Sequence, residues 1–403
     1  AQLGYGNSDT DLDAPSATAV DLGTGRTAVA IAAGFSHTCA ILDNGELKCW
    51  GGQSTWINYN GDPVSIDLGT GRTVVAVSAG DKHTCAILDD GSLKCWGSDP
   101  KGQLGMGNTA NQNAPPSTAI DLGTGRTAVA VAAGADHTCA VLDNGELKCW
   151  GGGYQGQLGD GSNTDSNEPS TTAIDLGTGR TAVAVSAGEY FTCAILDNGN
   201  VKCWGRDNHG QLGDGGTNLD TNEPSSTAID LGTGRTAVAL SSGSYHTCAI
   251  LDNGDLKCWG YNGFGELGDG STLSLNAPSS TAIDLGTSRT AVAISAGGSH
   301  TCAILDNGDM KCWGNDAVGQ LGDGGGNNNL NAPSSTAIDF GTGRTAVAVS
   351  TGYSHACAAL DNGDMKCWGN DGYGQLGDGG AKISGTKQSS PWLVYASPSP
   401  REA

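Results

Sequence analysis

Cysteine and histidine are the residues of this chain whose spacing points to chemistry. The 14 cysteines form seven pairs with nine residues inside each pair, and in six repeats a histidine precedes the first cysteine by two positions. The pairs are Cys39–Cys49, Cys85–Cys95, Cys139–Cys149, Cys193–Cys203, Cys248–Cys258, Cys302–Cys312 and Cys357–Cys367. Disulfide bonds and zinc ligation both use such sets.

The zinc interpretation meets two obstacles. His37, Cys39 and Cys49 supply three ligands, whereas a structural zinc site takes four. The fourth repeat has Phe191 in place of the histidine and still keeps both of its cysteines. Disulfide bonds are therefore the leading expectation, and zinc ligation and free thiols remain the alternatives.

The segment between the paired cysteines predicts a β-hairpin. Residues 42–46, LDNGE, suit a three-residue loop in which Gly45 adopts the left-handed conformation. Cys39 then faces Cys49 on a non-hydrogen-bonded rung, where Cα atoms lie about 4.5 Å apart, at the short end of disulfide geometry. Each bridge would contribute roughly 2–3 kcal/mol in the chain-entropy model. An even cysteine count at constant spacing favours an oxidising compartment.

Two other motifs imitate functional sites. The GTGRTA sequence from Gly23 resembles a dinucleotide fingerprint, but it leads into a strand pattern, so we expect a turn with an ion pair between Asp21 and Arg26. Acidic loops such as residues 160–168 suggest Ca²⁺ without matching an EF-hand, which predicts a solvated loop. No catalytic motif occurs, and the notable His and Asp residues recur with the repeat instead of forming one unique set. We therefore expect no catalytic residues, no enzyme activity and no cofactor, with Ca²⁺ as the one candidate cofactor.

A sevenfold repeat organises these residues. The segment HTCAILDNGELKCWG begins at His37 and recurs six times, at intervals of about 54 residues typical of propeller blades. In the first repeat, Val29 and Ile31 are expected on one face of a strand and Ala28 and Ala30 on the other. The prediction is an all-β, seven-bladed β-propeller with four-stranded antiparallel blades and one disulfide per blade. STAIDL and TAVAVSAG would flank the GTG turn, and HTCAIL and ELKCWG the DNG turn. The propeller would span residues 1–380, with 381–403 as a ring-closing strand or linker tail.

Charge and hydropathy exclude two classes of partner. The 42 acidic and 20 basic residues give a net charge of −22 without a basic cluster. Such a chain is repelled by nucleic acids and by anionic membranes. No apolar run reaches the roughly 20 residues that span a bilayer. We expect neither nucleic-acid binding nor direct membrane insertion.

The repeat resembles that of the regulator of chromosome condensation family. The resemblance rests on segments such as GFSHTCAILDNGELKCWG from Gly34 and NDGYGQLGDG from Asn370. It implies a seven-bladed propeller whose framework includes the repeated histidines and tryptophans, here His37, His83, His137, His246, His300 and His355 and the seven from Trp50 to Trp368. The family's namesake is a nuclear exchange factor for a small GTPase that binds chromatin. Paired cysteines look more like those of secreted bacterial or surface-displayed algal and protist members.

These observations lead to one main functional hypothesis and two alternatives. The main hypothesis is an extracellular or cell-surface propeller of the secretory pathway that acts in protein interaction or structural assembly. Its partners would be proteins, a larger surface assembly or further propellers of the same chain. The alternatives are an intracellular guanine-nucleotide exchange factor or scaffold, and a calcium- or carbohydrate-binding propeller.

Positions where the repeat varies are the candidates for specific contacts. The two residues inside each G-x-x-H and the residue before each GQLG change from repeat to repeat and are rich in aromatics, which are favoured in interface hot spots. Neutral drift at exposed loop positions explains the same variation. The loop after Trp50 lacks GQLG and carries its own aromatic pair. The candidate partner-binding residues are Trp56, Tyr59, Tyr190, Tyr245, Phe264, Tyr353 and Tyr373.

Overall fold

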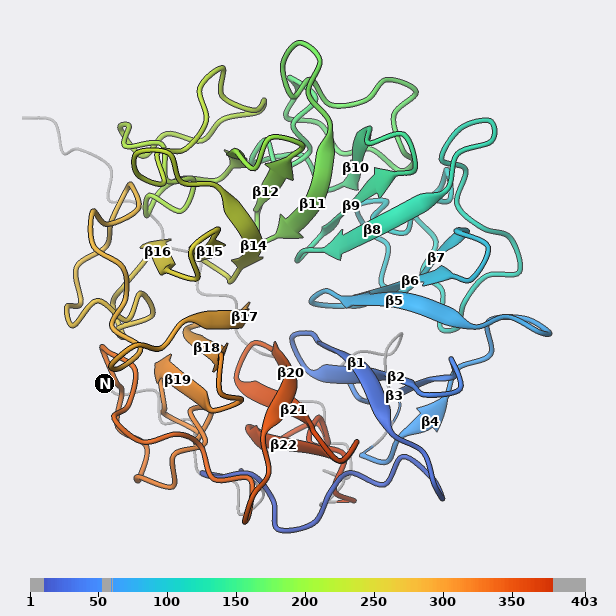
Figure 1. The fold of residues 1–403 in the computed structure, drawn as a ribbon. Helices are drawn as coiled ribbons and strands as arrows, with labels where there is room; N and C mark the ends of the chain where they lie inside the picture. The colour runs from blue at the N-terminus through green and yellow to red at the C-terminus, as the bar shows by residue number, and fades with distance from the viewer. Residues whose placement is uncertain (1–10, 53–58, 60, 380–403) are drawn as a thin grey trace, which may run out of the picture.

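The computed structural model describes residues 11–52, 59 and 61–379. In these residues seven antiparallel sheets surround a central axis, and no helix is present (Figure 1). The predicted seven-bladed β-propeller is confirmed, with one disulfide bond in each blade. The blades have three or four strands rather than four throughout.

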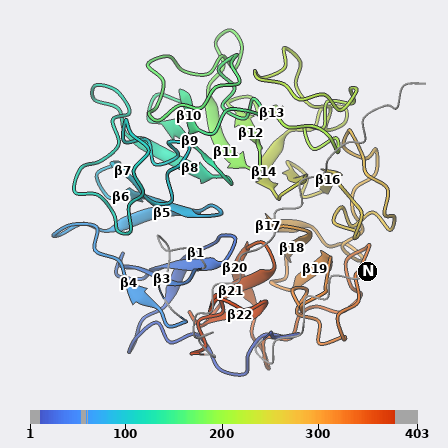
Figure 2. The same cartoon turned by 180° about the vertical axis from the view of Figure 1, so that it is seen from behind.

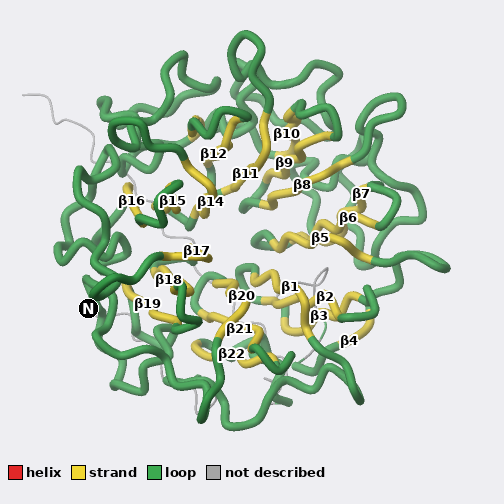
Figure 3. Tube along the Cα trace, viewed as in Figure 1, coloured by secondary structure: helices red, strands yellow, loops and turns green. Residues whose placement is uncertain are grey.

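Each repeat contributes three consecutive strands to one blade, and the blades are numbered from blade 1 (β1–β4) to blade 7 (β20–β22). The inner strands are β1 (Ala28–Ala33), β5 (Val74–Ala79), β8 (Ala128–Ala133), β11 (Ala182–Ala187), β14 (Ala237–Ser242), β17 (Ala291–Ala296) and β20 (Ala346–Thr351). The middle strands are β2 (His37–Leu42), β6 (His83–Leu88), β9 (His137–Leu142), β12 (Phe191–Leu196), β15 (His246–Leu251), β18 (His300–Leu305) and β21 (His355–Leu360). The third strands are β3 (Leu47–Gly51), β7 (Leu93–Gly97), β10 (Leu147–Gly151), β13 (Val201–Gly205), β16 (Leu256–Gly260), β19 (Met310–Gly314) and β22 (Met365–Gly369). A fourth strand, β4 (Val64–Ser65), belongs to blade 1. Figure 3 shows the strands around the axis and long loops outside them.

The hairpin register places the cysteines opposite each other as predicted. The Leu42 N–H donates to the Glu46 carbonyl at 2.9 Å, and Gly45 has a φ of 77°. Cys39 faces Cys49 with their Cα atoms 4.1 Å apart, and the other six pairs are equivalent. Because all 14 cysteines are bonded, no thiolate remains to ligate zinc.

A β-bulge changes the predicted alternation of the inner strands. Ala28 pairs with Leu42 and Ala30 with Ile41, so Val29 has no partner of its own. Two residues then oppose one, and the extra residue leaves the pleat. Val29 is 58% exposed although Ile31 packs against the core, so the prediction that both share one covered face is wrong. The corresponding valines of the other six blades are exposed in the same way.

The segment before each GTG turn belongs to the outer edge of the preceding blade. The N–H of Ile120 donates to the carbonyl of Leu93 in blade 2 at 2.9 Å, although Ile120 precedes the inner strand of blade 3. The prediction that this segment and the inner strand flank a hairpin turn is therefore wrong. The GTG turn carries the chain from the rim of one blade to the inner strand of the next.

The ring closes in the same way, because the N-terminal segment joins the outer edge of blade 7. Leu12 forms a bridge with Gly369 of blade 7, and the Val20 N–H donates to the Met365 carbonyl at 2.8 Å. The N-terminal segment thus completes the blade built from the last repeat, which Figure 2 shows from behind. Residues 381–403, predicted as a closing strand or tail, lie outside the described residues.

The hydrophobic core is divided into clusters between neighbouring blades. One cluster combines Cys39 and Ile41 of blade 1 with Val74, Leu88 and Trp96 of blade 2. The tryptophans of the seven Trp-Gly pairs, Trp50, Trp96, Trp150, Trp204, Trp259, Trp313 and Trp368, are all fully buried. Each disulfide therefore packs against the next blade, so stapling a hairpin also shapes an inter-blade contact.

Candidate functional site

Hairpin geometry separates the propeller into two ends. The Gly34-x-x-His37 loop and the end of β3 lie together, because His37 pairs with Gly51. The DNG turn and the start of β1 lie at the opposite end, because Ala28 pairs with Leu42. The first end, called here the variable end, carries the positions where the repeats differ. The second end, called the ion-pair end, repeats nearly unchanged in every blade.

The ion-pair end carries seven exposed arginine–aspartate pairs. Arg26 contacts Asp43 of the DNG turn at 3.1 Å, whereas Asp21 accepts the N–H of Gly23. The predicted Asp21–Arg26 ion pair is therefore wrong, because the short turn aims the Asp21 carboxylate at its own backbone. Equivalent arginine–aspartate contacts of 3.1 to 3.3 Å occur in the other six blades. Exposed pairs contribute at most about 1 kcal/mol each.

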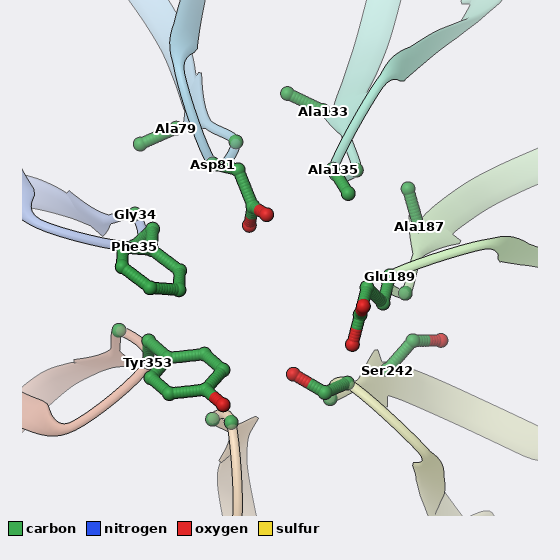
Figure 4. Close-up of a pocket in the computed structure, with 18 of the residues that line it drawn as sticks. Gly34, Phe35, Ala79, Asp81, Ala133, Ala135, Ala187, Glu189, Ser242 and Tyr353 are labelled. Carbon is green, nitrogen blue, oxygen red and sulfur yellow. The ribbon is translucent and has the colours of Figure 1, made fainter. Parts of the chain in front are cut away.

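At the variable end, the first variable residue of each G-x-x-H reaches the propeller axis. Together with the preceding small residues these positions line a cavity of about 80 Å³. The seven residues are Phe35, Asp81, Ala135, Glu189, Ser244, Gly298 and Tyr353. Figure 4 shows the side chains of Asp81, Glu189, Phe35 and Tyr353 directed into the cavity from different blades. We call it the axial cavity.

The axial cavity has an acidic side and an aromatic side. The rings of Phe35 and Tyr353 pack with their centroids 4.4 Å apart. Burial raises the pKa of Asp81 to about 7, and the Glu189 and Asp136 carboxylates add to the effect. Burial also raises the pKa of Glu189, although hydrogen bonds from Tyr245 and Tyr190 oppose it. Within the described residues neither Asp81 nor Glu189 forms a salt bridge.

Beside the cavity, aromatic side chains of blades 3, 4 and 5 form a continuous surface, called here the aromatic belt. Its members are Tyr154, Tyr190, Tyr245, Tyr261, Phe264 and His209, with neighbouring ring centroids 4.9 to 6.4 Å apart within blades 4 and 5 and 5.4 Å between Tyr154 and Tyr190. The Arg206 guanidinium lies over the Tyr190 and Tyr245 rings at 5.8 and 5.3 Å from their centroids and bridges the two groups. Such contacts hold large rings in fixed orientations.

The structure brings together some of the predicted contact residues and separates others. Tyr190, Tyr245 and Phe264 lie in the aromatic belt, and Tyr353 lines the axial cavity. Tyr373 is 41% exposed in the loop after β22, and Trp56 lies outside the described residues. The belt members Tyr154 and Tyr261 and the bridging Arg206 were not among the residues predicted from the sequence. They lie in the few residues after each Trp-Gly, another stretch where the repeats differ.

Tyr59 has a structural place instead of an exposed one. In six blades the tryptophan Nε1–H donates to the backbone carbonyl of the GQLG or GELG loop, as Trp150 does to Gln103 at 3.0 Å. The loop after blade 1 lacks that sequence, and there Trp96 donates to the Tyr59 hydroxyl at 2.6 Å. Tyr59 also hydrogen-bonds Thr84, and burial raises its pKa to about 12. Its hydroxyl replaces a missing carbonyl oxygen and contacts the framework.

The described residues contain neither a metal-binding cluster nor a membrane-spanning helix. No group of three or more His, Cys, Asp or Glu side chains is arranged to hold a metal ion there. That part of the chain also has no helix long and apolar enough to cross a membrane.

Fold and site together define a disulfide-stapled β-propeller with one sequence-variable, aromatic and acidic end. Seven segments match the Regulator of chromosome condensation (RCC1) repeat, at residues 28–55, 74–103, 128–157, 182–211, 237–266, 291–320 and 346–375. The chain belongs to this family.

Known relatives differ in how much of their own length matches this chain. The chain is 31% identical to the ultraviolet-B receptor UVR8 of Arabidopsis thaliana over 69% of its own length and 72% of the receptor. It is 30% identical to the human E3 ubiquitin-protein ligase HERC2 over 69% of its length but only 6% of that protein. The ligase is therefore matched through a small part.

Solved structures share the fold at low sequence identity. Human WBSCR16 has a TM-score of 0.72 at 21% identity, covering 86% of this chain and 87% of its own. Prp20p from Saccharomyces cerevisiae, described with its binding to Gsp1p and histones, has a TM-score of 0.68 at 20% identity, with coverages of 84% and 81%. The CRINKLY ectodomain of the Arabidopsis thaliana receptor kinase ACR4 has a TM-score of 0.51 at 20% identity, with coverages of 85% and 95%.

Proposed function

We propose that this chain is a non-catalytic, protein-binding propeller of the cell exterior, and that it binds its partner at the variable end. The observation that carries the proposal is the aromatic belt beside the axial cavity. Large rings held in place by their neighbours supply contact area at low entropic cost, and such residues dominate interface hot spots. The ion-pair end repeats the same exposed ion pair seven times and offers little to distinguish one partner from another.

The family supports a protein as the class of partner. Prp20p, which shares this fold, was described with its binding to the proteins Gsp1p and histones. The net charge of −22 disfavours nucleic acid as the partner here. The acidic axial cavity instead favours a partner surface with positive charge.

The disulfides support an extracellular or cell-surface location. Seven bonds persist in oxidising compartments and are rare in the reducing cytosol. A receptor-kinase ectodomain shares the fold. The intracellular exchange-factor hypothesis would require these bonds to survive a compartment that reduces them.

Binding at the variable end is tested with matched surface variants. Phe264→Ala combined with Tyr154→Ala removes exposed belt residues, and Val238→Ser changes an even more exposed apolar residue at the ion-pair end. Partners are captured from secreted and surface fractions, and the dissociation constant of each purified partner is then measured for every variant. We expect the belt variant to bind at least about tenfold more weakly and the Val238 variant to bind as wild type. Wild-type affinity in the belt variant would overturn the proposal.

The location is tested through the thiols and through nucleotide exchange. Protein from its native source is denatured without a reducing agent and then alkylated, and none of the 14 cysteines should be labelled. Reduction before alkylation should allow all 14 to be labelled. The protein should not accelerate nucleotide release from small GTPases. Extensive labelling without reduction, or acceleration of release, would favour the intracellular alternative.

A further inference from the structure

The walls of the axial cavity are held by hydrogen bonds between blades. The N–H of Phe35 donates to the Gly80 carbonyl and that of Asp81 to the Gly134 carbonyl, each at 3.3 Å. Four more contacts of 3.2 to 3.3 Å continue around the axis and end with Tyr353 donating to Gly34. A side chain at Gly34 would collide with the Gly80 carbonyl, so the wall stays open only with glycine there. The cavity is therefore preformed.

Two carboxylates reach this preformed space without a counter-ion. Asp81 comes from blade 2 and Glu189 from blade 4, and Figure 4 shows both directed toward the axis. Lys82 and Arg206 lie close enough to influence them, but neither forms a salt bridge with them. The tyrosine hydroxyls that hydrogen-bond Glu189 replace part of its lost hydration, and a cation would replace the missing charge interaction. Among the described residues, no lysine or arginine lines the cavity.

The aromatic side of the cavity narrows the choice of cation. The packed Phe35 and Tyr353 rings face the same space as the two carboxylates. A guanidinium is planar and weakly hydrated, stacks on aromatic faces and pairs with carboxylates through two parallel hydrogen bonds. An ammonium is a compact, strongly hydrated charge, and a metal ion makes no use of the rings.

The volume of the cavity indicates which kind of molecule carries the positive charge. Its volume of about 80 Å³ lies well below the roughly 300–1,000 Å³ of pockets that enclose whole ligands. The end of one side chain fits, while its stem and backbone remain outside beside the aromatic belt. We propose that the axial cavity receives a single arginine side chain presented by the protein partner, with its guanidinium between Asp81, Glu189 and the Phe35–Tyr353 pair.

This inference rests on the proposed function, and small probes test it separately. N-acetyl-arginine amide is titrated calorimetrically into the full chain, next to its neutral isostere N-acetyl-citrulline amide and to N-acetyl-lysine amide. We expect the arginine probe to bind in the millimolar range and at least about tenfold more tightly than the other two. Binding should also release protons near neutral pH, seen as a dependence of the heat on the buffer, because the cation favours the ionised carboxylates.

Variants locate the binding. Asp81→Asn and Glu189→Gln should each weaken the arginine probe about tenfold or more, since each removes a charged hydrogen-bond partner. Glu223→Gln, an exposed carboxylate in the loop after blade 4, is the matched control and should bind as wild type. Circular dichroism and thermal unfolding establish that each variant is folded.

Defined outcomes overturn the inference. These are equal binding of citrulline or lysine, binding unchanged in both cavity variants, displacement of the probe by Ca²⁺ alone, or no binding at tens of millimolar. If the belt variant loses the partner while arginine fails to bind, only this inference fails. If arginine binds in the cavity while the belt variant keeps the partner, the proposed function fails instead.

Discussion

The imidazole Nε2 of His37 lies 2.9 Å from the hydroxyl oxygen of Thr84 in the next blade. Four further interfaces have the same pair at 2.8 to 3.0 Å. In most of them the threonine hydroxyl donates to a loop carbonyl, as Thr138 does to Gln103, so the histidine must donate through Nε2. Burial lowers the pKa of these histidines, so in this chain each is a neutral connector between blades. Phe191 interrupts this ring at one interface and Ala356 at another.

Ala356 leaves His300 without the threonine that the other histidines contact. Both ring nitrogens of His300 are buried without a side-chain partner among the described residues. Ala356→Thr should supply the hydroxyl and raise the free energy of unfolding by about 1 kcal/mol, measured in urea. Thr301→Ala, which removes the partner of His246, should lower it by about 1–3 kcal/mol. A destabilised Ala356 variant would contradict this account.

Tyr59→Phe tests the hydroxyl that completes the interface of blades 1 and 2. Without that oxygen, the Trp96 N–H and the Thr84 hydroxyl both lose a buried partner. The free energy of unfolding should fall by about 1–3 kcal/mol. The hydroxyl of Tyr261, in the aromatic belt, has no hydrogen bond to the described residues, so Tyr261→Phe should change stability by less than about 0.5 kcal/mol. Equal effects in the two variants would show that Tyr59 is not a framework residue.

The buried carboxyl group of Asp207 predicts a loss of stability as the pH rises from 3.8 to about 7. It is fully buried, its Oδ1 accepts the Leu212 N–H at 2.9 Å, and its Oδ2 has no partner in the described part of the chain. Burial, followed by the carboxylates of Asp214 and Asp220, raises its pKa from 3.8 to about 7. Between these values the folded state keeps a proton that the unfolded chain releases. The contribution of this carboxyl to stability is therefore present below pH 3.8 and is lost as the pH rises through 7.

In blade 5, Asn262 occupies the position equivalent to Asp207 and avoids this loss of stability. Its Oδ1 accepts the Leu267 N–H, and its Nδ2 lies 3.2 to 3.3 Å from four loop oxygens. Asp207→Asn should therefore stabilise the protein by roughly 2–4 kcal/mol at about pH 8 and have little effect below about pH 4. If Ca²⁺ stabilises the wild type and not the variant, the carboxylate holds a cation rather than a proton.

His83 predicts the opposite trend at acidic pH. Burial, with smaller effects from His137 and His37, lowers its pKa from 6.5 to about 3. Below pH 6.5 the imidazole of the unfolded chain binds a proton, whereas the buried imidazole stays neutral. The contribution of this histidine to stability is therefore present above pH 6.5 and is lost as the pH falls through 3.

His83→Phe copies the fully buried Phe191 of blade 4 and removes this titration. Between about pH 6 and pH 4, the slope of the unfolding free energy should decrease by about 1.4 kcal/mol per pH unit. Urea unfolding at several pH values measures it. An unchanged slope would mean that the histidine is not held neutral.

The fold was within reach of the sequence because its decisive contacts are local. Gly45 sets the DNG turn, and the turn alone places Cys39 opposite Cys49, so the disulfides follow from hairpin geometry. Seven copies of one half-buried unit then leave a closed propeller as the way to cover every sheet.

Contacts between separate segments of the chain were decided by tertiary structure. Within blade 1, Arg26 pairs with Asp43 rather than with Asp21, and between blades Tyr59 turns inward to Trp96, because strand pairing and blade packing set those distances. The axial cavity is the clearest case. Asp81 and Glu189 are 108 positions apart in the sequence and line one cavity only because the blades point the same loop at one axis. Sequence spacing identified the positions that vary, and ring closure made a site of them.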